Sequence, residues 1–187
     1  EEIPFDLPSN WCWSRIETAL FLQAGKFISA NEIHEVADEK HRYPCYGGNG
    51  KRGFVDRFNT YGKHPIIGRQ GALCGNINFA SGDFYATEHA VVVDVFAKCS
   101  SELIALFLTA LNLNQYSTAT AQPGLSVNVI NSLLLPIPPL AEQQRIVAQI
   151  ETLLGYVDII DTDAETLEKS ITLAKQKILD LAIRGKL

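Results

Sequence analysis

The chain has 187 residues, 47% of them apolar, and a formal net charge of −5 at pH 7. This size and composition suit one globular domain with an appendage and exclude a disordered chain, because the apolar content is sufficient for a core. No apolar run approaches the roughly 20 residues of a membrane-spanning helix, and nothing resembles a signal peptide. The chain contains no methionine, even at position 1, so we expect a trimmed chain or an excised fragment.

The first third of the chain predicts only short elements. Residues 1–13 form an extended entry segment in which Trp11 and Trp13 occupy one face of a strand. Residues 15–22 fit either a helix or a strand, and we favour a strand. Residues 31–42 are polar and mixed, which indicates a loop or a short helix.

Charge is distributed unevenly along this region. Residues 1–39 hold eight acidic side chains and two basic ones, whereas residues 40–69 hold seven Lys and Arg against the single acid Asp56. The net negative charge by itself disfavours a nucleic-acid partner, but a local basic cluster decides where a polyanion docks. The alternative is a solvated basic face without a partner.

The segment from Tyr43 to Gly53 is rich in glycine and could be taken for a phosphate-binding loop. It fails the P-loop pattern because Lys51 is followed by Arg52 rather than Ser or Thr, and the glycine spacing is wrong. It also lacks the strand and helix that flank a dinucleotide site, so nucleotide hydrolysis is disfavoured. The run instead offers exposed backbone amides beside side chains that contact phosphates and bases. A tight hairpin turn with incidental basic residues is the alternative.

The remaining globular part predicts a mixed α/β fold. Val91, Val92 and Val93 form the strongest strand signal in the chain. The expected elements are a buried strand at 65–68 followed by a loop at 69–71, strands at 77–79 and 90–96, a helix at 101–112 capped by Ser100 or Ser101, a type II turn at 122–124, and a last strand at 133–137.

Polar residues that recognise DNA accumulate in this region. Arg69 and Gln70 directly follow an apolar strand, so we expect them to project from a rigid edge. Arginine pairs with guanine through two hydrogen bonds, and Gln or Asn pairs in the same way with adenine. We expect phosphate contacts from Lys51, Arg52 and Arg57, and base contacts from Asn49, Arg69, Gln70 and Asn76. The candidate DNA-binding residues are Tyr46, Asn49, Lys51, Arg52, Arg57, Arg69, Gln70 and Asn76.

Signals for catalysis or metal binding are weak. The four histidines have no metal-ligand spacing, and the four cysteines contain no CxxC pair, so we expect no metal site. Widely spaced cysteines are typical of reduced, buried thiols in a cytoplasmic protein. A Cys–His nucleophile pair lacks supporting context. Glu88 and His89 could form an acid–base pair, but structural hydrogen bonding at the start of a strand is favoured. We therefore assign no catalytic residue.

The C-terminal part of the chain carries an unbroken 4-3 apolar repeat. Such a repeat predicts a long helix that pairs in a left-handed coiled coil. From Ala141 to Ile183 the helix would be about 65 Å long, with Gly155 its only breaker. The basic end complements the helix dipole. The acidic middle would repel an identical helix laid antiparallel and centred on it, which favours an offset or non-identical partner helix. The apolar positions of this repeat, which form one stripe along the helix and are called the seam, are Ile146, Ile150, Leu153, Val157, Ile160, Ala164, Leu167, Ile171, Ala174, Ile178 and Leu181. The residues expected to make the pairing contacts are Ile150, Leu153, Val157, Ile160, Leu167, Ile171, Ile178 and Leu181.

The change of pattern near Pro139 divides the chain into a mixed α/β domain, residues 1–139, and one long coiled-coil-forming helix, residues 140–187. At this level the chain resembles half of a type I restriction–modification specificity subunit. Three stretches carry the resemblance: Ile3–Pro8 with Trp11 and Trp13; Tyr46–Gly50 and Ile67–Gly75 followed by Ala86–Val91; and Ala121–Leu125 through Ile137–Ile146, ending in Ala182–Leu187. The Pro-Pro-Leu-Ala-Glu-Gln junction before the helix is the most specific part.

The resemblance implies a target recognition domain at 1–139 and a spacer and dimerisation helix at 140–187. A full subunit has two such halves with antiparallel helices, and each domain reads one part of a split double-stranded DNA site. Methyltransferase subunits would supply S-adenosylmethionine, and a motor–nuclease subunit would use ATP and Mg²⁺. This chain would itself catalyse nothing. Since only one half is present, we expect a half-length subunit acting as a dimer or an excised half. The alternative is an assembly adaptor that does not bind DNA.

Overall fold

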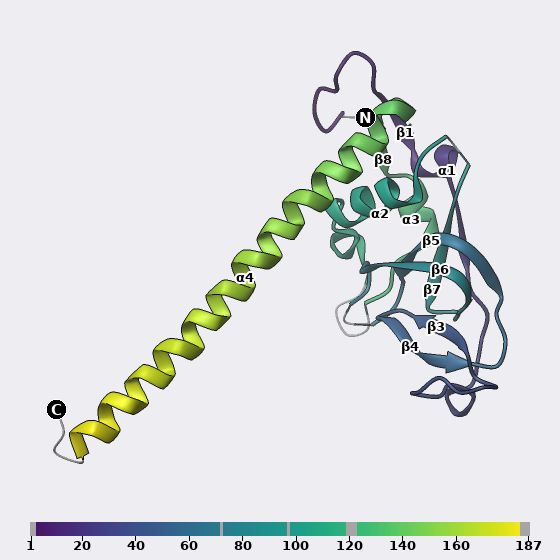
Figure 1. Ribbon diagram of the computed structural model, residues 1–187. Helices are drawn as coiled ribbons and strands as arrows, with labels where there is room; N and C mark the ends of the chain where they lie inside the picture. The colour runs from purple at the N-terminus through teal and green to yellow at the C-terminus, as the bar shows by residue number, and fades with distance from the viewer. Residues whose placement is uncertain (1–2, 72, 97, 119–122, 184–187) are drawn as a thin grey trace. The chain divides into compact units, whose positions relative to one another are not determined.

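The computed structural model describes residues 3–71, 73–96, 98–118 and 123–183, with side chains as far as residue 177 in the last helix. The chain divides into two compact units, Glu1–Gln144 and Arg145–Leu187, which are described separately. The first unit combines strands and short helices, and the second is helical (Figure 1). The expected mixed α/β fold followed by a long helix is confirmed.

A six-stranded sheet forms the centre of the first unit, in the order β2-β7-β5-β6-β3-β4. Neighbouring strands are antiparallel except β3 and β6, which are parallel. The strands are β2 (Leu20–Ala24), β3 (Tyr43–Gly47), β4 (Gly50–Val55), β5 (Thr60–Gly68), β6 (Ile77–Ala86) and β7 (Ala90–Val95).

Strands β5 and β6 are much longer than the short strands predicted at 65–68 and 77–79. Residues 60–64 and 80–84 contain Gly62, Gly82 and charged side chains, which have low strand propensity. They pair with each other across the sheet, with Gly62 opposite Gly82, so their backbone groups are satisfied by tertiary pairing. Local propensity therefore missed the outer half of this hairpin.

A second, two-stranded sheet joins β1 (Cys12–Arg15) to β8 (Leu134–Ile137), with Trp13 opposite Pro136. Between β1 and β2 the chain makes a single helical turn, α1 (Ile16–Ala19). Ile16 and Ala19 are both buried, and a helical turn brings residues three apart to the same side. The strand expected at 15–22 is thus correct only at its two ends.

The remaining elements of the first unit are short helices. Helix α2 (Ser101–Ala110) is capped by Ser100, whose Oγ accepts a hydrogen bond from the Leu103 backbone N–H at 3.0 Å. Ser100 is one of the two residues predicted as the cap. The other short helices are η1 (Ala30–Glu32), η2 (Leu113–Tyr116) and α3 (Val127–Asn131). The turn predicted at 122–124 includes residue 122, which lies outside the described residues.

The core lies on both faces of the six-stranded sheet. On one face Ile67, Val91 and Val93 pack with the buried side of α2, including Ile104 and Leu108. On the other face Ile66 and Val92 join a cluster that includes Phe84. The alternation of 66 with 67 and of 91, 92 and 93 follows the two-residue period of a strand. Full burial of each such side chain contributes about 1.5–3 kcal/mol.

The long helix α4 (Leu140–Ile183) begins within the first unit, where Gln143 anchors it. Gln143 is 1% exposed: its Oε1 accepts from the Ser100 backbone N–H at 2.8 Å, and its Nε2 donates to the carbonyl oxygens of Lys98 and Pro138, each at 3.0 Å. Trp11 Nε1 also donates to Glu142 Oε2 at 2.9 Å. These bonds tie the first helical turn to the globular unit.

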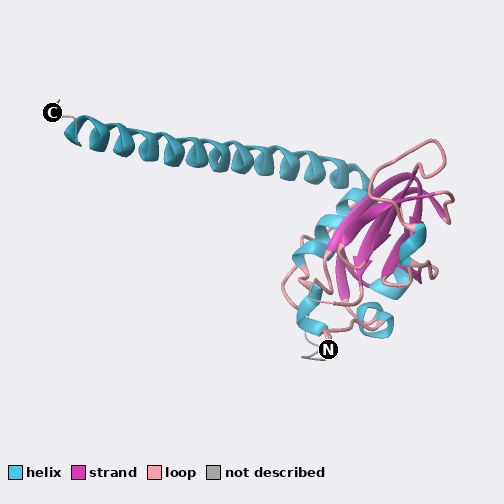
Figure 2. Cartoon of the chain, turned by 90° about the horizontal axis from the view of Figure 1, so that it is seen from below, coloured by secondary structure: helices cyan, strands magenta, loops and turns pink. Residues whose placement is uncertain are grey.

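Within the second unit α4 is one uninterrupted helix (Figure 2). Its seam side chains are largely exposed; Ile160 is 65% and Leu167 62% exposed, although both are strongly apolar. Ile178 and Leu181, also predicted to make pairing contacts, lie outside the described side chains. Pairing with another helix stays a prediction. Within the described ranges, no helix combines the length and apolarity needed to cross a bilayer.

Candidate nucleic-acid interface

The two glycine-rich segments that the sequence singled out touch each other in the structure. β3 and β4 form a hairpin in which Gly47 pairs with Gly50 across the two-residue loop Gly48-Asn49. The carbonyl oxygen of Gly48 lies so close to Gly68, at the end of β5, that a Cβ on Gly68 would collide with it. Glycine at position 68 is therefore what allows the hairpin tip to lie against the end of β5.

A third segment, the turn between β6 and β7, completes the arrangement. The Thr87 backbone N–H donates to the Tyr46 carbonyl at 2.9 Å, and the Arg69 N–H donates to the His89 carbonyl at 3.0 Å. Backbone hydrogen bonds thus connect the hairpin, the end of β5 and this turn. Together they form a hollow of about 390 Å³. Its lining residues are Gly48, Asn49, Arg52, Gln70, Gly71 and His89.

Three predicted DNA-binding residues line this hollow: Asn49, Arg52 and Gln70. Arg69 lies next to Gln70, with its backbone held on both sides because its carbonyl accepts from Leu125 N–H at 3.0 Å. The buried Nε of Arg69 has no hydrogen-bond partner. The structure therefore gathers donors and amides from positions 49, 52, 69 and 70 on a backbone that is fixed by hydrogen bonds.

Three other predicted residues lie apart from the hollow or are already engaged. Asn76 lines a separate hollow of about 380 Å³ with Asn112 and Asn114. The Tyr46 ring packs edge-on against Phe84, and its burial raises the pKa of the phenol, which indicates a packing role. The Nζ of Lys51 lies 3.9 Å from the centre of the Phe54 ring, a cation–π contact. Their DNA contacts stay predictions.

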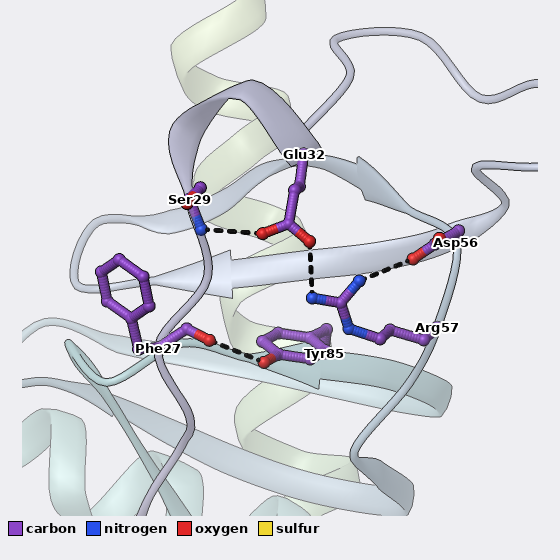
Figure 3. Close-up of polar contacts among 6 residues, drawn as sticks. All are labelled: Phe27, Ser29, Glu32, Asp56, Arg57 and Tyr85. Carbon is purple, nitrogen blue, oxygen red and sulfur yellow. Dashed lines mark hydrogen bonds and ion pairs between the residues drawn. The ribbon is translucent and has the colours of Figure 1, made fainter.

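Arg57, predicted to contact phosphate, is held in an intramolecular ion-pair network (Figure 3). One guanidinium nitrogen lies 2.7 Å from Glu32 Oε2 and another 3.0 Å from Asp56 Oδ1. The Ser29 backbone N–H donates to the other oxygen of Glu32 at 3.2 Å, so η1 is part of the same network. The hydrogen bond from Arg57 lowers the pKa of Glu32, and the same bond raises the pKa of Arg57. In the structure, then, Arg57 ties η1 to the segment after β4.

The turn before β7 adds His89 to this site, a residue that was not predicted to bind DNA. Glu88 Oε1 and His89 Nε2 lie 3.2 Å apart in the turn before β7, consistent with the structural role that was favoured, but His89 also lines the hollow. The only available signal was a charged pair placed directly before the strongest strand. The hollow itself depends on contacts between distant segments.

Several buried polar atoms in the strands and turns near the hollow have no hydrogen-bond partner. Among the described residues, seven buried side-chain atoms lack a hydrogen-bond partner, and five of them belong to these converging strands and turns. The five are Arg69 Nε, Asn78 Nδ2, Thr87 Oγ1, Glu88 Oε2 and His89 Nδ1. Each such group costs about 1–3 kcal/mol when it is left unpaired. Of these five residues, His89 is the one that lines the hollow.

The cysteines provide no nucleophile in this region. All four are free thiols, and burial raises the pKa of Cys45 to about 11, so its thiol is protonated at neutral pH. Cys45 and Cys74 are buried as predicted and Cys99 is partly buried. The prediction is wrong for Cys12, which is exposed because it lies at the start of β1 with its side chain outside the core.

Comparisons with known proteins identify relatives of the whole chain. The family model of the type I restriction modification DNA specificity domain matches residues 10–169. The EcoprrI type I restriction enzyme specificity subunit of Escherichia coli is 48% identical over 130 residues, which cover 70% of this chain and 32% of that protein. The EcoDI specificity subunit of Escherichia coli is 32% identical over 202 residues, covering all of this chain and 44% of that protein.

Two solved structures show the same fold. One comes from a study of complex assembly and conformational transition of the type I R-M system; it matches with a TM-score of 0.83 and 19% identity, over 98% of this chain and 48% of that chain. The HsdS subunit of Thermoanaerobacter tengcongensis matches with a TM-score of 0.72 and 18% identity, over 100% and 48% of the two chains. The chain spans about a third to a half of the length of these relatives.

Proposed function

Since the chain belongs to the family of type I restriction modification DNA specificity domains, we propose that it recognises one part of a bipartite DNA sequence within a restriction–modification complex. The observation that carries the proposal is the hollow of about 390 Å³, where Asn49, Arg52, Gln70 and His89 meet on a rigid backbone. The residue types are those that contact phosphates and base edges. His89, whose Nδ1 has no hydrogen-bond partner, lies in its lining and favours a polar ligand.

The proposal separates two kinds of contact. Lys51 and Arg52 are exposed on β4 and would bind phosphates, which fixes the position of the domain on the duplex. Asn49, Arg69, Gln70 and Asn76 would read bases, and the fixed backbone around Arg69 favours a defined direction for its side chain. Arg57 would contribute a phosphate contact only by leaving Glu32 and Asp56, so we expect it to contribute least.

The chain would act with partners and catalyse no step itself. Methyltransferase subunits that bind S-adenosylmethionine and an ATP-dependent, Mg²⁺-requiring restriction subunit would supply the chemistry, in the cytoplasm. The exposed apolar seam of α4 supports pairing with the helix of a second copy or second half, laid antiparallel, because apolar side chains such as Ile160 would otherwise remain in water. The length of that helix would then set the gap between the two parts of the DNA site.

Methylation mapping tests the proposal directly. The chain is co-expressed with its methyltransferase subunit, and modified adenines are mapped across the host DNA. A split, inverted-repeat motif is expected if two copies pair through their helices, and a split motif with unrelated parts if a second half completes the subunit. A stable protein complex that leaves DNA unmodified and whose assembly is unaffected by added DNA would instead support the adaptor function.

Two variants separate the proposed contacts. Arg69→Ala is expected to relax sequence preference, at about 1–3 kcal/mol for a bidentate base contact. Lys51→Ala is expected to weaken binding to all sequences alike and to reduce the salt slope by about one. If both variants lose affinity equally for every sequence, the assignment of base and phosphate roles is wrong.

A further inference from the structure

The loop between η1 and β3 contains a compact turn that orients two side chains. Asp38 Oδ1 accepts hydrogen bonds from the backbone N–H groups of Lys40 at 2.8 Å and His41 at 2.6 Å. The Asp38 N–H in turn donates to the His41 carbonyl at 3.2 Å. These bonds fix the carboxylate and leave its Oδ2 facing the His41 ring, whose Nδ1 lies 3.0 Å away.

A second histidine reaches the same place from a different part of the loop. The ring of His34 stacks on that of His41, with 3.6 Å between centroids and 15° between planes. The His34 backbone is fixed by two hydrogen bonds with Phe54 of β4, at 2.9 and 2.7 Å. One ligand atom from each of His34, Asp38 and His41 lies within 4.8 Å of the others.

We propose that His34, Asp38 and His41 bind one divalent transition-metal ion of the zinc class. Two imidazoles and a carboxylate suit this class, with water completing a tetrahedral set. Ligands about 2.0–2.1 Å from zinc lie roughly 3.3 Å apart, close to the observed separation of His41 Nδ1 and Asp38 Oδ2. His34 is exposed, so rotation of its side chain out of the stack with His41 would bring its ring nitrogen to the ion, while the Asp38 carboxylate stays where its turn holds it.

The carboxylate is already in the form that binds metal. An aspartate carboxylate is ionised at neutral pH, and the backbone N–H groups of Lys40 and His41 hold this one in place. The metal would take the position of the proton between His41 Nδ1 and Asp38 Oδ2. Sequence spacing gave no indication of this cluster, because the stacking of His34 on His41 depends on pairing with β4.

A bound ion would link the two strands of the β3–β4 hairpin. Asp38 and His41 lie just before Tyr43, where β3 begins, whereas His34 is attached to Phe54 in β4. The ion would therefore join the entry of the hairpin to its second strand at Phe54. Because only the folded chain presents the three ligands together, binding would raise the thermal midpoint. This inference is independent of the proposed DNA recognition.

Zinc titration of the full chain tests the proposal. A Cys12→Ser background removes the exposed thiol, and the protein is stripped with a chelator before calorimetry with Zn²⁺. One ion per chain and a zinc-dependent rise in the thermal midpoint are expected. Asp38→Asn and His41→Gln are each expected to weaken zinc binding by more than about tenfold. Asp38→Asn keeps the turn, because its amide oxygen still accepts from both backbone N–H groups.

Glu35→Gln is the matched control, since Glu35 is an exposed acid in the same loop and outside the cluster. It is expected to bind zinc like the parent. Circular dichroism in the presence of chelator confirms that the variants are folded. Absence of stoichiometric zinc binding by the parent overturns the proposal. Equal binding by the parent, Asp38→Asn and His41→Gln also overturns it, because the metal would then be held adventitiously elsewhere.

Discussion

Replacing Gln143 by alanine is expected to loosen the attachment of α4 to the globular unit. Gln143 is 1% exposed and bonds the Ser100 N–H, the Pro138 carbonyl and the Lys98 carbonyl. Lys98 is exposed, so when Gln143 is replaced by alanine its carbonyl can accept a hydrogen bond from water instead. The Ser100 N–H and the carbonyl of buried Pro138 would remain unpaired, at about 1–3 kcal/mol each. We expect a total loss of roughly 2–6 kcal/mol in the free energy of unfolding.

Fluorescence is the appropriate assay, because both tryptophans, Trp11 and Trp13, lie in the segment that contacts this junction. For a chain of this size the loss corresponds to a fall of about 4–24 °C in the thermal midpoint. Gln144→Ala is the control: the adjacent glutamine is exposed, and its truncation is expected to change stability by less than about 0.5 kcal/mol. Equal midpoints for the two variants would refute the anchoring role of Gln143.

Three further outcomes are expected. Gly68→Ala pushes a methyl group into the Gly48 carbonyl, so we expect the free energy of unfolding, measured by chemical denaturation, to fall by about 1–3 kcal/mol and DNA binding to weaken. Gly124→Ala is the control, because a methyl group there meets open space. The folded-state pKa of Glu32 is lowered, so its ion pair with Arg57 stabilises the fold fully above the unfolded pKa of about 4.5, and this stabilisation is lost as pH falls through the folded value. Arg57→Ala should therefore reduce the difference in the free energy of unfolding between pH 7 and pH 3. An unchanged difference would contradict this. Ile171→Asp places an unpaired charge in the apolar seam and is expected to reduce the oligomeric mass in light scattering if the parent is an oligomer; an unchanged mass would argue against helix pairing.

Elements specified by local patterns were predictable from the sequence. The α4 helix follows from a 3.5-residue apolar repeat without proline, and it is observed from Leu140 to Ile183. β7 follows from three consecutive valines, and α2 from a serine cap before an apolar stretch. In each case the signal lies within a few residues of the element, so no knowledge of distant contacts was needed.

The candidate site could be predicted only as separate pieces. Residue types at 49, 52, 69 and 70 indicated polyanion recognition, because their donors suit phosphates and base edges. Which of them act together depends on the contact of Gly48 with Gly68 and on the turn at 87–89, which are distant in sequence. His89 was therefore missed, and Asn76 was grouped with residues from which the fold separates it.

Tertiary structure alone decided which charged groups are committed to the fold. The sequence determined the long helix, the mixed α/β class and the basic character of residues 40–69, since these depend on composition and short-range periodicity. It did not determine that Glu32 holds Arg57, that Asp38 joins two histidines, or that residues 60–64 continue a strand. Those outcomes arise when chain closure brings distant groups within a few ångströms, where hydrogen bonds and ion pairs first become possible.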